Sequence, residues 1–298
     1  MSASPSVTTS SPPGTLARVG SLVKFSHTIF ALPFALAAVV LALPYGSFTW
    51  TKLVLIVLAI AAARTAAMAF NRLVDRDIDA DNPRTKDREI PRGVLSASFV
   101  RALVLGSCAV FVVCAALLGP LPLYLSPVAL GLALGYSYVK RYSSWCHLVL
   151  GAAIAFAPGG AWIAVGAPVT GAPWLLVFGV ATWVGGFDIL YSLQDEGFDR
   201  AAGLHSIPAR FGTVGALWIS GLLHVLTCVC LVATGLLLGR GVVFFAGCLL
   251  IAAILAYEHA LVKPGDLSKI DKAFFDLNGY VSVAFFGCVL VDHFLSRV

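Results

Sequence analysis

Two stretches of the sequence place carboxylates about one helical turn apart. The first holds Asn71, Asp75 and Asp79 at intervals of four residues. The second has intervals of three, four and four residues, and its members are Asp188, Tyr191, Asp195 and Asp199. Side chains three or four residues apart share one face of a helix, so each set is expected to form a stripe. Ten of the 15 acidic residues fall within windows 75–89 and 188–199, so the acids are concentrated at these stripes.

The chemistry of such stripes is that of cation binding. Carboxylates a turn apart raise each other's pKa unless positive charge lies between them. Mg²⁺ prefers oxygen ligands and commonly binds through one or two carboxylates together with substrate phosphates. Two stripes facing across a cavity can therefore hold a diphosphate through Mg²⁺. The alternative is a pair of solvated helix ends whose acids pair with Arg76, Arg84 and Arg88. The occurrence of both stripes on one side of the chain favours the diphosphate site.

Arg64 lies seven residues before Asn71, on the same expected helix face and two turns deeper. An arginine near the centre of a membrane helix costs about 2.5–3.5 kcal/mol on insertion scales. Such a residue usually faces a polar cavity, where it can hold an anionic substrate group. The alternatives are a pairing with a nearby carboxylate and a side chain that reaches the membrane surface.

The composition decides which elements must position these residues. Of 298 residues, 59% are hydrophobic and 12% charged, with a mean hydropathy of +0.91. Soluble domains carry about 25% charged residues, so an ordinary cytosolic enzyme, a disordered protein and a disulfide scaffold are excluded. We expect an all-α polytopic membrane protein whose helices surround a central cavity that opens to the cytoplasmic side. Nine apolar runs approach the length of about 20 residues that spans a bilayer: 28–47, 52–70, 97–118, 121–138, 146–166, 172–193, 213–237, 241–260 and 277–296.

Orientation follows from the basic residues. Sixteen of the 20 Lys and Arg residues lie in the N-terminal segment and in the loops after the second, fourth, sixth and eighth runs, against three on the other face. The positive-inside rule places the first face in the cytoplasm. We therefore predict a multi-pass protein of the cytoplasmic (inner) membrane, with its N-terminus and active-site loops cytoplasmic. This placement of charge is not a nucleic-acid surface, and no feature calls for an obligate protein partner. Residues 1–19, rich in Ser, Pro and Thr, are expected to be disordered, and 20–298 to form the transmembrane domain.

At these motifs the sequence resembles the UbiA family of intramembrane prenyltransferases. The family pattern NxxxDxxxD is met at 71–79, and DxxYxxxDxxxD at 188–199. The segment 136–141 looks like the family's Y-x-x-x-K-R segment, and 24–33 and 273–279 look like those of its quinone-pathway members. Two positions depart from the commoner pattern, Arg72 directly after the first Asn and His205 in place of Lys. Both departures look like the 4-hydroxybenzoate polyprenyltransferase-like branch, some of whose members serve menaquinone synthesis. They concern the aromatic acceptor rather than the metal positions.

The resemblance implies transfer of a polyprenyl group from polyprenyl diphosphate to an aromatic ring carbon in respiratory quinone biosynthesis, with 4-hydroxybenzoate or a related menaquinone precursor as acceptor. It assigns Mg²⁺ to Asn71, Asp75, Asp79, Asp195 and Asp199. Basic side chains are then expected on the diphosphate oxygens, and the candidates are Lys140, Arg141 and Arg72. Tyr191 or Tyr136 can face an allyl cation, Asp188 is the candidate for holding or deprotonating the acceptor, and Arg64 for its carboxylate. The bilayer supplies the isoprenoid tail through apolar grooves.

The main alternative is a cation-coupled membrane transporter. Intramembrane acids and helices broken by Gly or Pro also mark transport paths. The acids here lie at the predicted cytoplasmic helix ends rather than at the midplane, and the opposite half has few polar residues to form an exit. The sequence therefore favours the enzyme, and a purely structural protein has no use for two matched stripes.

Overall fold

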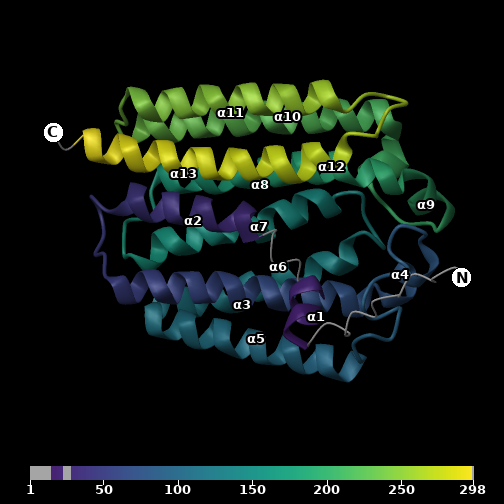
Figure 1. The fold of residues 1–298 in the computed structure, drawn as a ribbon. Coiled ribbons are helices and arrows are strands. Elements are labelled where there is room, and N and C mark those ends of the chain that lie inside the picture. Colours follow the sequence, from purple (N-terminus) through teal and green to yellow (C-terminus); the bar gives the residue numbers. More distant parts are fainter. Residues whose placement is uncertain (1–14, 23–27, 297–298) are drawn as a thin grey trace, which may run out of the picture.

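The computed structural model describes residues 15–22 and 28–296. This part of the chain is helical and contains no strand, so the expected all-α fold is confirmed. The longer helices run side by side as a bundle (Figure 1). Their bounds are α1 Thr15–Leu22, α2 Thr28–Ala42, α3 Trp50–Val74, α4 Arg76–Asp81, α5 Ala97–Leu118, α6 Pro120–Val139, α7 Cys146–Ala164, α8 Gly171–Ser192, α9 Glu196–Ala201, α10 Ile207–Leu237, α11 Val242–Leu261, α12 Ile270–Lys272 and α13 Asn278–Leu295. A 3₁₀ turn, Leu193–Asp195, joins α8 to α9, and a π-helical turn, Ala273–Leu277, joins α12 to α13.

Local sequence explains where several helices begin. Thr49, Ser96 and Ser206 precede α3, α5 and α10, and the side-chain oxygen of each accepts a backbone N–H of the first turn at 3.1–3.2 Å. Such caps satisfy N–H groups that have no partner within the helix. Pro120 begins α6, where its missing N–H costs nothing. Short polar residues and proline thus set the helix starts.

Glycine at position 212 breaks the long helix α10. Its φ of 71° is left-handed, a conformation that side chains disfavour, and the chain kinks there. The regular helix after the kink corresponds to the expected run 213–237. Proline has a milder effect, since α2, α6 and α7 continue through Pro33, Pro127 and Pro158 as expected.

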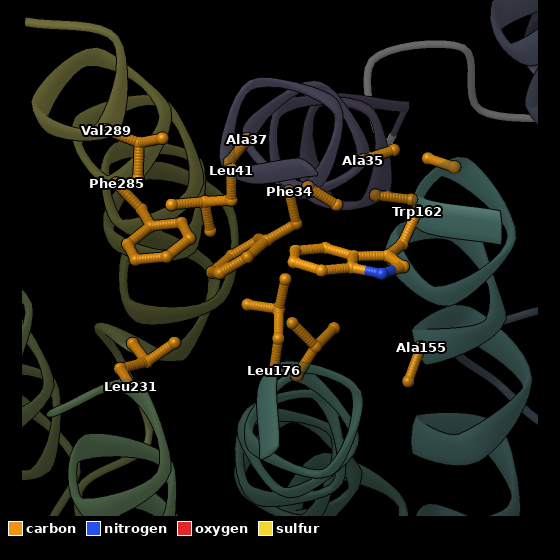
Figure 2. Packing of buried hydrophobic residues seen from close by; sticks show 14 of the residues in the cluster. Phe34, Ala35, Ala37, Leu41, Ala155, Trp162, Leu176, Leu231, Phe285 and Val289 are labelled. Atoms are coloured by element: carbon orange, nitrogen blue, oxygen red, sulfur yellow. The ribbon is translucent and has the colours of Figure 1, made fainter. Parts of the chain in front are cut away.

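The apolar core lies where α2 packs between α7 and α13, against α8 (Figure 2). Phe34 of α2 is fully buried, and its ring lies 4.9 Å, centroid to centroid, from both Trp183 and Phe285. Gly151 permits a close approach of α7 and α8, because a Cβ there would lie 2.2 Å from the carbonyl oxygen of Ala181. This packing fixes α7 against α8, the two helices that supply His147 and Asp188 to the site described below.

The protein is a multi-span membrane protein. In the described part of the chain, seven helical segments are long and apolar enough to cross a bilayer: Trp50–Val74, Ala97–Leu118, Cys146–Ala164, Gly171–Ala201, Ile207–Leu237, Val242–Leu261 and Ile270–Leu295. Two of the nine expected runs are not among them. Helix α2 has only 15 residues, and the 20-residue α6 is less apolar, with three prolines, three tyrosines and two serines. Nine membrane spans therefore remain a prediction.

The described residues test the predicted N-terminal boundary only in part. Residues 1–14 and 23–27 lie outside them, including the motif residues Lys24 to His27. Helix α1 covers 15–19, the last part of the segment expected to be disordered. At one end of the bundle lie α4 and α9, while α13 ends at the other (Figure 1). Both acidic windows therefore meet at the same end of the molecule.

Candidate functional site

The first acidic stripe crosses a helix break. Helix α3 ends at Val74, Asp75 has non-helical angles, and α4 begins at Arg76. The i+4 pattern persists across the break, since the backbone N–H of Asp75 bonds to Asn71 and that of Asp79 to Asp75. The amide nitrogen Nδ2 of Asn71 donates to Oδ2 of Asp75 at 2.8 Å. The structure thus brings Asn71 and Asp75 into contact and keeps Asp79 one turn further on.

The second stripe crosses a similar break. Asp188 and Tyr191 lie in α8, Asp195 ends the 3₁₀ turn, and Asp199 lies in α9. Asp195 is 6% exposed and Asp199 is fully buried. Carboxylates are rarely buried unless they are paired. These two acids are therefore not the solvated helix end of the alternative interpretation.

Four carboxylates of the two stripes each pair with one basic side chain. Arg141 lies 3.1 Å from Asp75, and Arg88 lies 2.6 Å from Asp79. Two further pairs involve the second stripe: Lys140 Nζ lies 2.7 Å from Asp199, and Arg84 pairs with Asp195. The alternative interpretation expected Arg84 and Arg88 to pair with acids of the stripes, and both do. Arg76 instead pairs with Asp77 at the surface. Alternating charge lets four acids share one end of the bundle.

Lys140 and Arg141 connect the two stripes. These consecutive residues follow α6, and they pair with Asp199 and Asp75 respectively. Arg141 Nη2 also donates to the carbonyl of Val74 at 2.8 Å, where α3 ends. Arg72, the third predicted diphosphate residue, is 5% exposed and forms no ion pair among the described residues, and its Nε has no hydrogen-bond partner there. All three cations lie at the acidic stripes, and Arg72 and Arg141 each have a buried Nε with no hydrogen-bond partner among the described residues.

The loop between α4 and α5 supplies two residues that the stripe analysis missed as site residues. Asn82 is 7% exposed, and its Nδ2 donates to Oδ1 of Asp195 at 3.0 Å. Arg84 Nε donates to the same oxygen at 2.9 Å. Burial disfavours the charged form of Arg84, but the hydrogen bonds to Asp195 outweigh it and raise the pKa of Arg84. The Asn-Pro dipeptide at 82–83 signals a turn, but it does not identify the carboxylate that the turn reaches.

The carboxylates have unused capacity that fits a divalent cation. Among the described residues, Oδ2 of Asp79 and both oxygens of Asp199 are buried without a hydrogen bond, although Asp199 forms an ion pair. Burial raises the pKa of Asp75, and the hydrogen bond from Arg141 opposes that rise. Buried polar atoms normally have partners, and a carboxylate with a raised pKa gains from added positive charge. A hard oxygen-binding cation such as Mg²⁺ suits this set of donors.

An apolar cavity of about 300 Å³ lies between α3, α5, α6 and α7. Its lining includes Arg64 and Tyr136, with Ser126 and Trp174 as the other residues that carry polar side-chain atoms. The Nε of Arg64 is buried and has no partner among the described residues. Tyr136 interacts electrostatically with Arg72, Asp75 and Asp188, so this end of the cavity adjoins the stripes. Arg64 therefore lines a cavity, but this cavity is largely apolar, whereas its position in the sequence predicted a polar one.

Tyr191 does not line this cavity. Its ring stacks on Phe274 of the π-helical turn, with centroids 4.0 Å apart, and the guanidinium of Arg84 lies 5.4 Å from the ring centroid. The two tyrosines left open by the sequence are thus separated in space: Tyr136 lines the cavity, and Tyr191 packs beside the Arg84–Asp195 pair. Asp188 forms no ion pair with the basic residues that pair with the other acids of the stripes. Its Oδ2 instead lies 2.7 Å from Nδ1 of His147.

Comparisons with known proteins agree with this arrangement. The sequence model of the UbiA prenyltransferase family matches residues 31–283. A protein of Alkalilimnicola ehrlichii named 4-hydroxybenzoate octaprenyltransferase is 32% identical over 81% of this chain and 82% of its own length. One of Vibrio atlanticus with the same name is 29% identical over 89% and 90%.

Solved structures show the same fold. The apo structure of a UbiA homologue from Aeropyrum pernix superposes with a TM-score of 0.81 at 35% identity, over 89% of this chain and 98% of that one. A UbiA homologue from Archaeoglobus fulgidus bound to GPP and Mg²⁺ gives a TM-score of 0.73 at 20% identity, over 92% and 98%. Matches of this extent in sequence and in fold place the chain in the UbiA prenyltransferase family.

Proposed function

We propose that this protein transfers a polyprenyl group from polyprenyl diphosphate to a ring carbon of an aromatic acid, 4-hydroxybenzoate or a related menaquinone precursor, in respiratory quinone biosynthesis. The observation that carries the proposal is the meeting of two acidic stripes, joined by Lys140 and Arg141, at the polar end of an apolar cavity. The relatives named 4-hydroxybenzoate octaprenyltransferase support this choice of acceptor.

The reaction balances without a redox partner. The bond between C1 of the prenyl group and its diphosphate oxygen breaks, C1 bonds to a ring carbon, that carbon loses a proton, and diphosphate leaves. Negative charge grows on the leaving diphosphate, so fixed positive groups beside it lower the barrier. Lys140, Arg141 and Arg72 are the residues of this chain that bind it, and the first two are also paired with Asp199 and Asp75.

Mg²⁺ is proposed as the cofactor, held by Asn71, Asp75, Asp79, Asp195 and Asp199. Bound there, it supplies further positive charge for the diphosphate. Oδ2 of Asp79 and Oδ2 of Asp199, which have no hydrogen-bond partner among the described residues, support this assignment, as does the GPP- and Mg²⁺-bound relative. Lys140 and Arg141 would share their positive charge between these carboxylates and the diphosphate, so diphosphate and metal binding are expected to depend on each other.

The cavity divides between the two substrates. Its apolar walls, from Ile56 and Ile60 to Phe156, suit the isoprenoid chain and exclude water from an allyl cation. Arg64 offers a bidentate contact for the carboxylate of the aromatic acid, and Asp188 holds or deprotonates the ring. Tyr136, which lines the cavity, is better placed than Tyr191 to face the cation.

We further propose the cytoplasmic (inner) membrane as the location, with the N-terminus and site loops in the cytoplasm. The charge asymmetry of the sequence supports it. Both stripes lie at one end of the bundle (Figure 1), so one compartment supplies the metal and the aromatic acid.

The decisive experiment incubates purified protein in lipid with Mg²⁺, a panel of prenyl diphosphates and a panel of aromatic acids, and identifies prenylated products by mass spectrometry. Octaprenyl diphosphate with 4-hydroxybenzoate is the first pair to test. A C-prenylated acid is the expected product. Absence of any prenylated product, with the protein folded and inserted, would refute the proposed function, whereas cation-driven uptake into vesicles would support a transporter.

A further inference from the structure

We infer that His147 is a positioning residue that holds Asp188 as an oriented carboxylate for the aromatic acceptor, an inference that rests on the proposed function. His147 is the second residue of α7. Its Nδ1 lies 2.7 Å from Oδ2 of Asp188, and its side chain is 3% exposed against 24% for Asp188. His147 is therefore closed off from substrates, while Asp188 remains accessible. Any effect of His147 on the acceptor passes through Asp188.

The second ring nitrogen of His147 fixes the position of the proton. The backbone N–H of Ile207, the first residue of α10, donates to Nε2 of His147 at 3.3 Å. A nitrogen that accepts a hydrogen bond carries no proton, so the single proton of the neutral ring is on Nδ1. Nδ1–H then donates to Asp188. The same ring thus satisfies a backbone N–H that has no partner within its own helix.

This hydrogen bond acts on one oxygen of Asp188 and leaves the other available. A donor to the charged form of a carboxylate favours that form. Among the described residues, Oδ1 accepts no hydrogen bond. Tyr136, which lines the cavity, lies close enough to Asp188 to interact with it electrostatically. Oδ1 is therefore free to accept the hydroxyl or ring proton of an acceptor.

The geometry of α7 links this pair to the cavity. Leu150 and Ile154, one and two turns after His147, both line the cavity. The imidazole lies beyond the lining, between α7, α8 and the start of α10. The orientation of Asp188 is thus set by α7, α8 and α10 together. A solvated carboxylate of α8 would be restrained by α8 alone.

Two variants separate the proposed role from a purely structural one. In His147→Asn the amide nitrogen takes about the place of Nδ1, so it can still donate to Asp188 but cannot reach Ile207. In His147→Gln the amide lies near Nε2, so it can bond to Ile207 but not to Asp188. Steady-state rates with the acceptor and the prenyl diphosphate varied in turn are measured for both, alongside thermal unfolding in detergent.

We expect His147→Gln to lose at least about tenfold in kcat, because a hydrogen bond to a charged group is lost, with the KM for prenyl diphosphate unchanged. His147→Asn should keep most of the rate although it loses the bond to Ile207. In an Asp188→Asn background, His147→Gln should cost little more, since the two changes remove one interaction.

The opposite order, with a low kcat for His147→Asn and a kcat close to wild type for His147→Gln, would overturn the inference and leave His147 as a cap of α10. Equal, additive losses in the double variant would overturn it too. If the His147→Gln variant does not accumulate in the membrane, the His147→Asn variant decides alone, because a loss of tenfold or more in its kcat contradicts the role. Failure of the wild-type protein to prenylate any acceptor would instead count against the proposed function.

Discussion

Asn82 donates a hydrogen bond from Nδ2 to Oδ1 of Asp195 at 3.0 Å, across 113 residues of sequence. The bond ties the loop after α4, which belongs to the first acidic window, to the second window. Arg84 reaches the same carboxylate from the same loop. Asp195, in the second stripe, is therefore held by the loop that follows the first stripe. The relative position of the two stripes depends on this loop.

Replacing Asn82 should show whether this contact matters. Asn82→Ala removes one hydrogen bond to a charged group, for which about 1.5–3 kcal/mol is typical, so we expect kcat to fall by roughly tenfold. Asn82→Asp has nearly the same shape but brings a second carboxylate to Asp195 and should be worse than Ala. Prenylation rates of both variants test the order. Wild-type activity of Asn82→Asp would contradict the role of this bond.

The metal proposal predicts that activity requires Mg²⁺ and both stripes. Asp75→Ala and Asp195→Ala should each abolish prenylation without preventing insertion. Asp77 offers a matched control in the same window, because its side chain is 85% exposed and pairs only with Arg76 at the surface. Exposed pairs contribute about 0–1 kcal/mol, so Asp77→Ala should stay near wild type. Full turnover in EDTA, or near-normal rates in both stripe variants, would rule out the metal site.

Arg64 is expected to bind the aromatic acid. Arg64→Lys keeps the charge but loses the planar, bidentate contact. A loss of about 1.5–3 kcal/mol corresponds to a roughly 10- to 150-fold rise in the KM of the acceptor. The KM for prenyl diphosphate should change far less. The exposed Arg101 of α5, replaced by Lys, is the control.

Kinetics with each substrate varied in turn distinguish the possible roles of Arg64. An effect confined to the KM of the diphosphate would assign Arg64 to the diphosphate site. Low expression with unchanged kinetics would make it a structural residue. Stripe variants should instead lose kcat, because their contacts strengthen as diphosphate leaves.

The orientation can be tested with reporter fusions. Fusions after residues 95, 142, 203 and 268 should report the cytoplasm, and those after 49, 119 and 169 the opposite side, as the basic residues predict. An external signal from position 95 would reverse the orientation and separate the acidic stripes from cytoplasmic aromatic acids.

Much of this architecture was predictable because local patterns carry it. The break after Val74 did not disturb the spacing of Asn71 and Asp75, since the i+4 backbone bonds continue through it. Arg64 faces a cavity because an unpaired arginine is costly in lipid. Spacing alone did not reveal that α2 has only 15 residues, because its apolar run continues to 47 through the turn after Ala42.

Contacts between distant segments were not predictable. Nothing near Asn82 in the sequence identifies Asp195 as its partner, and His147 looks like one more histidine in an apolar run. Both residues gain their roles from the packing of α7, α8 and the loop after α4. A single sequence shows which residues lie on one helix face, but not which face opposes another.

The order of Lys140 and Arg141 in the chain limits how far the site can open. One residue is paired with Asp199 and the next with Asp75. Consecutive Cα atoms are about 3.8 Å apart, so the two stripes cannot move far from each other while both pairs persist. Widening the site to admit a diphosphate requires the release of at least one pair. Access to the site is thus linked to an exchange of ion-pair partners at Lys140 and Arg141.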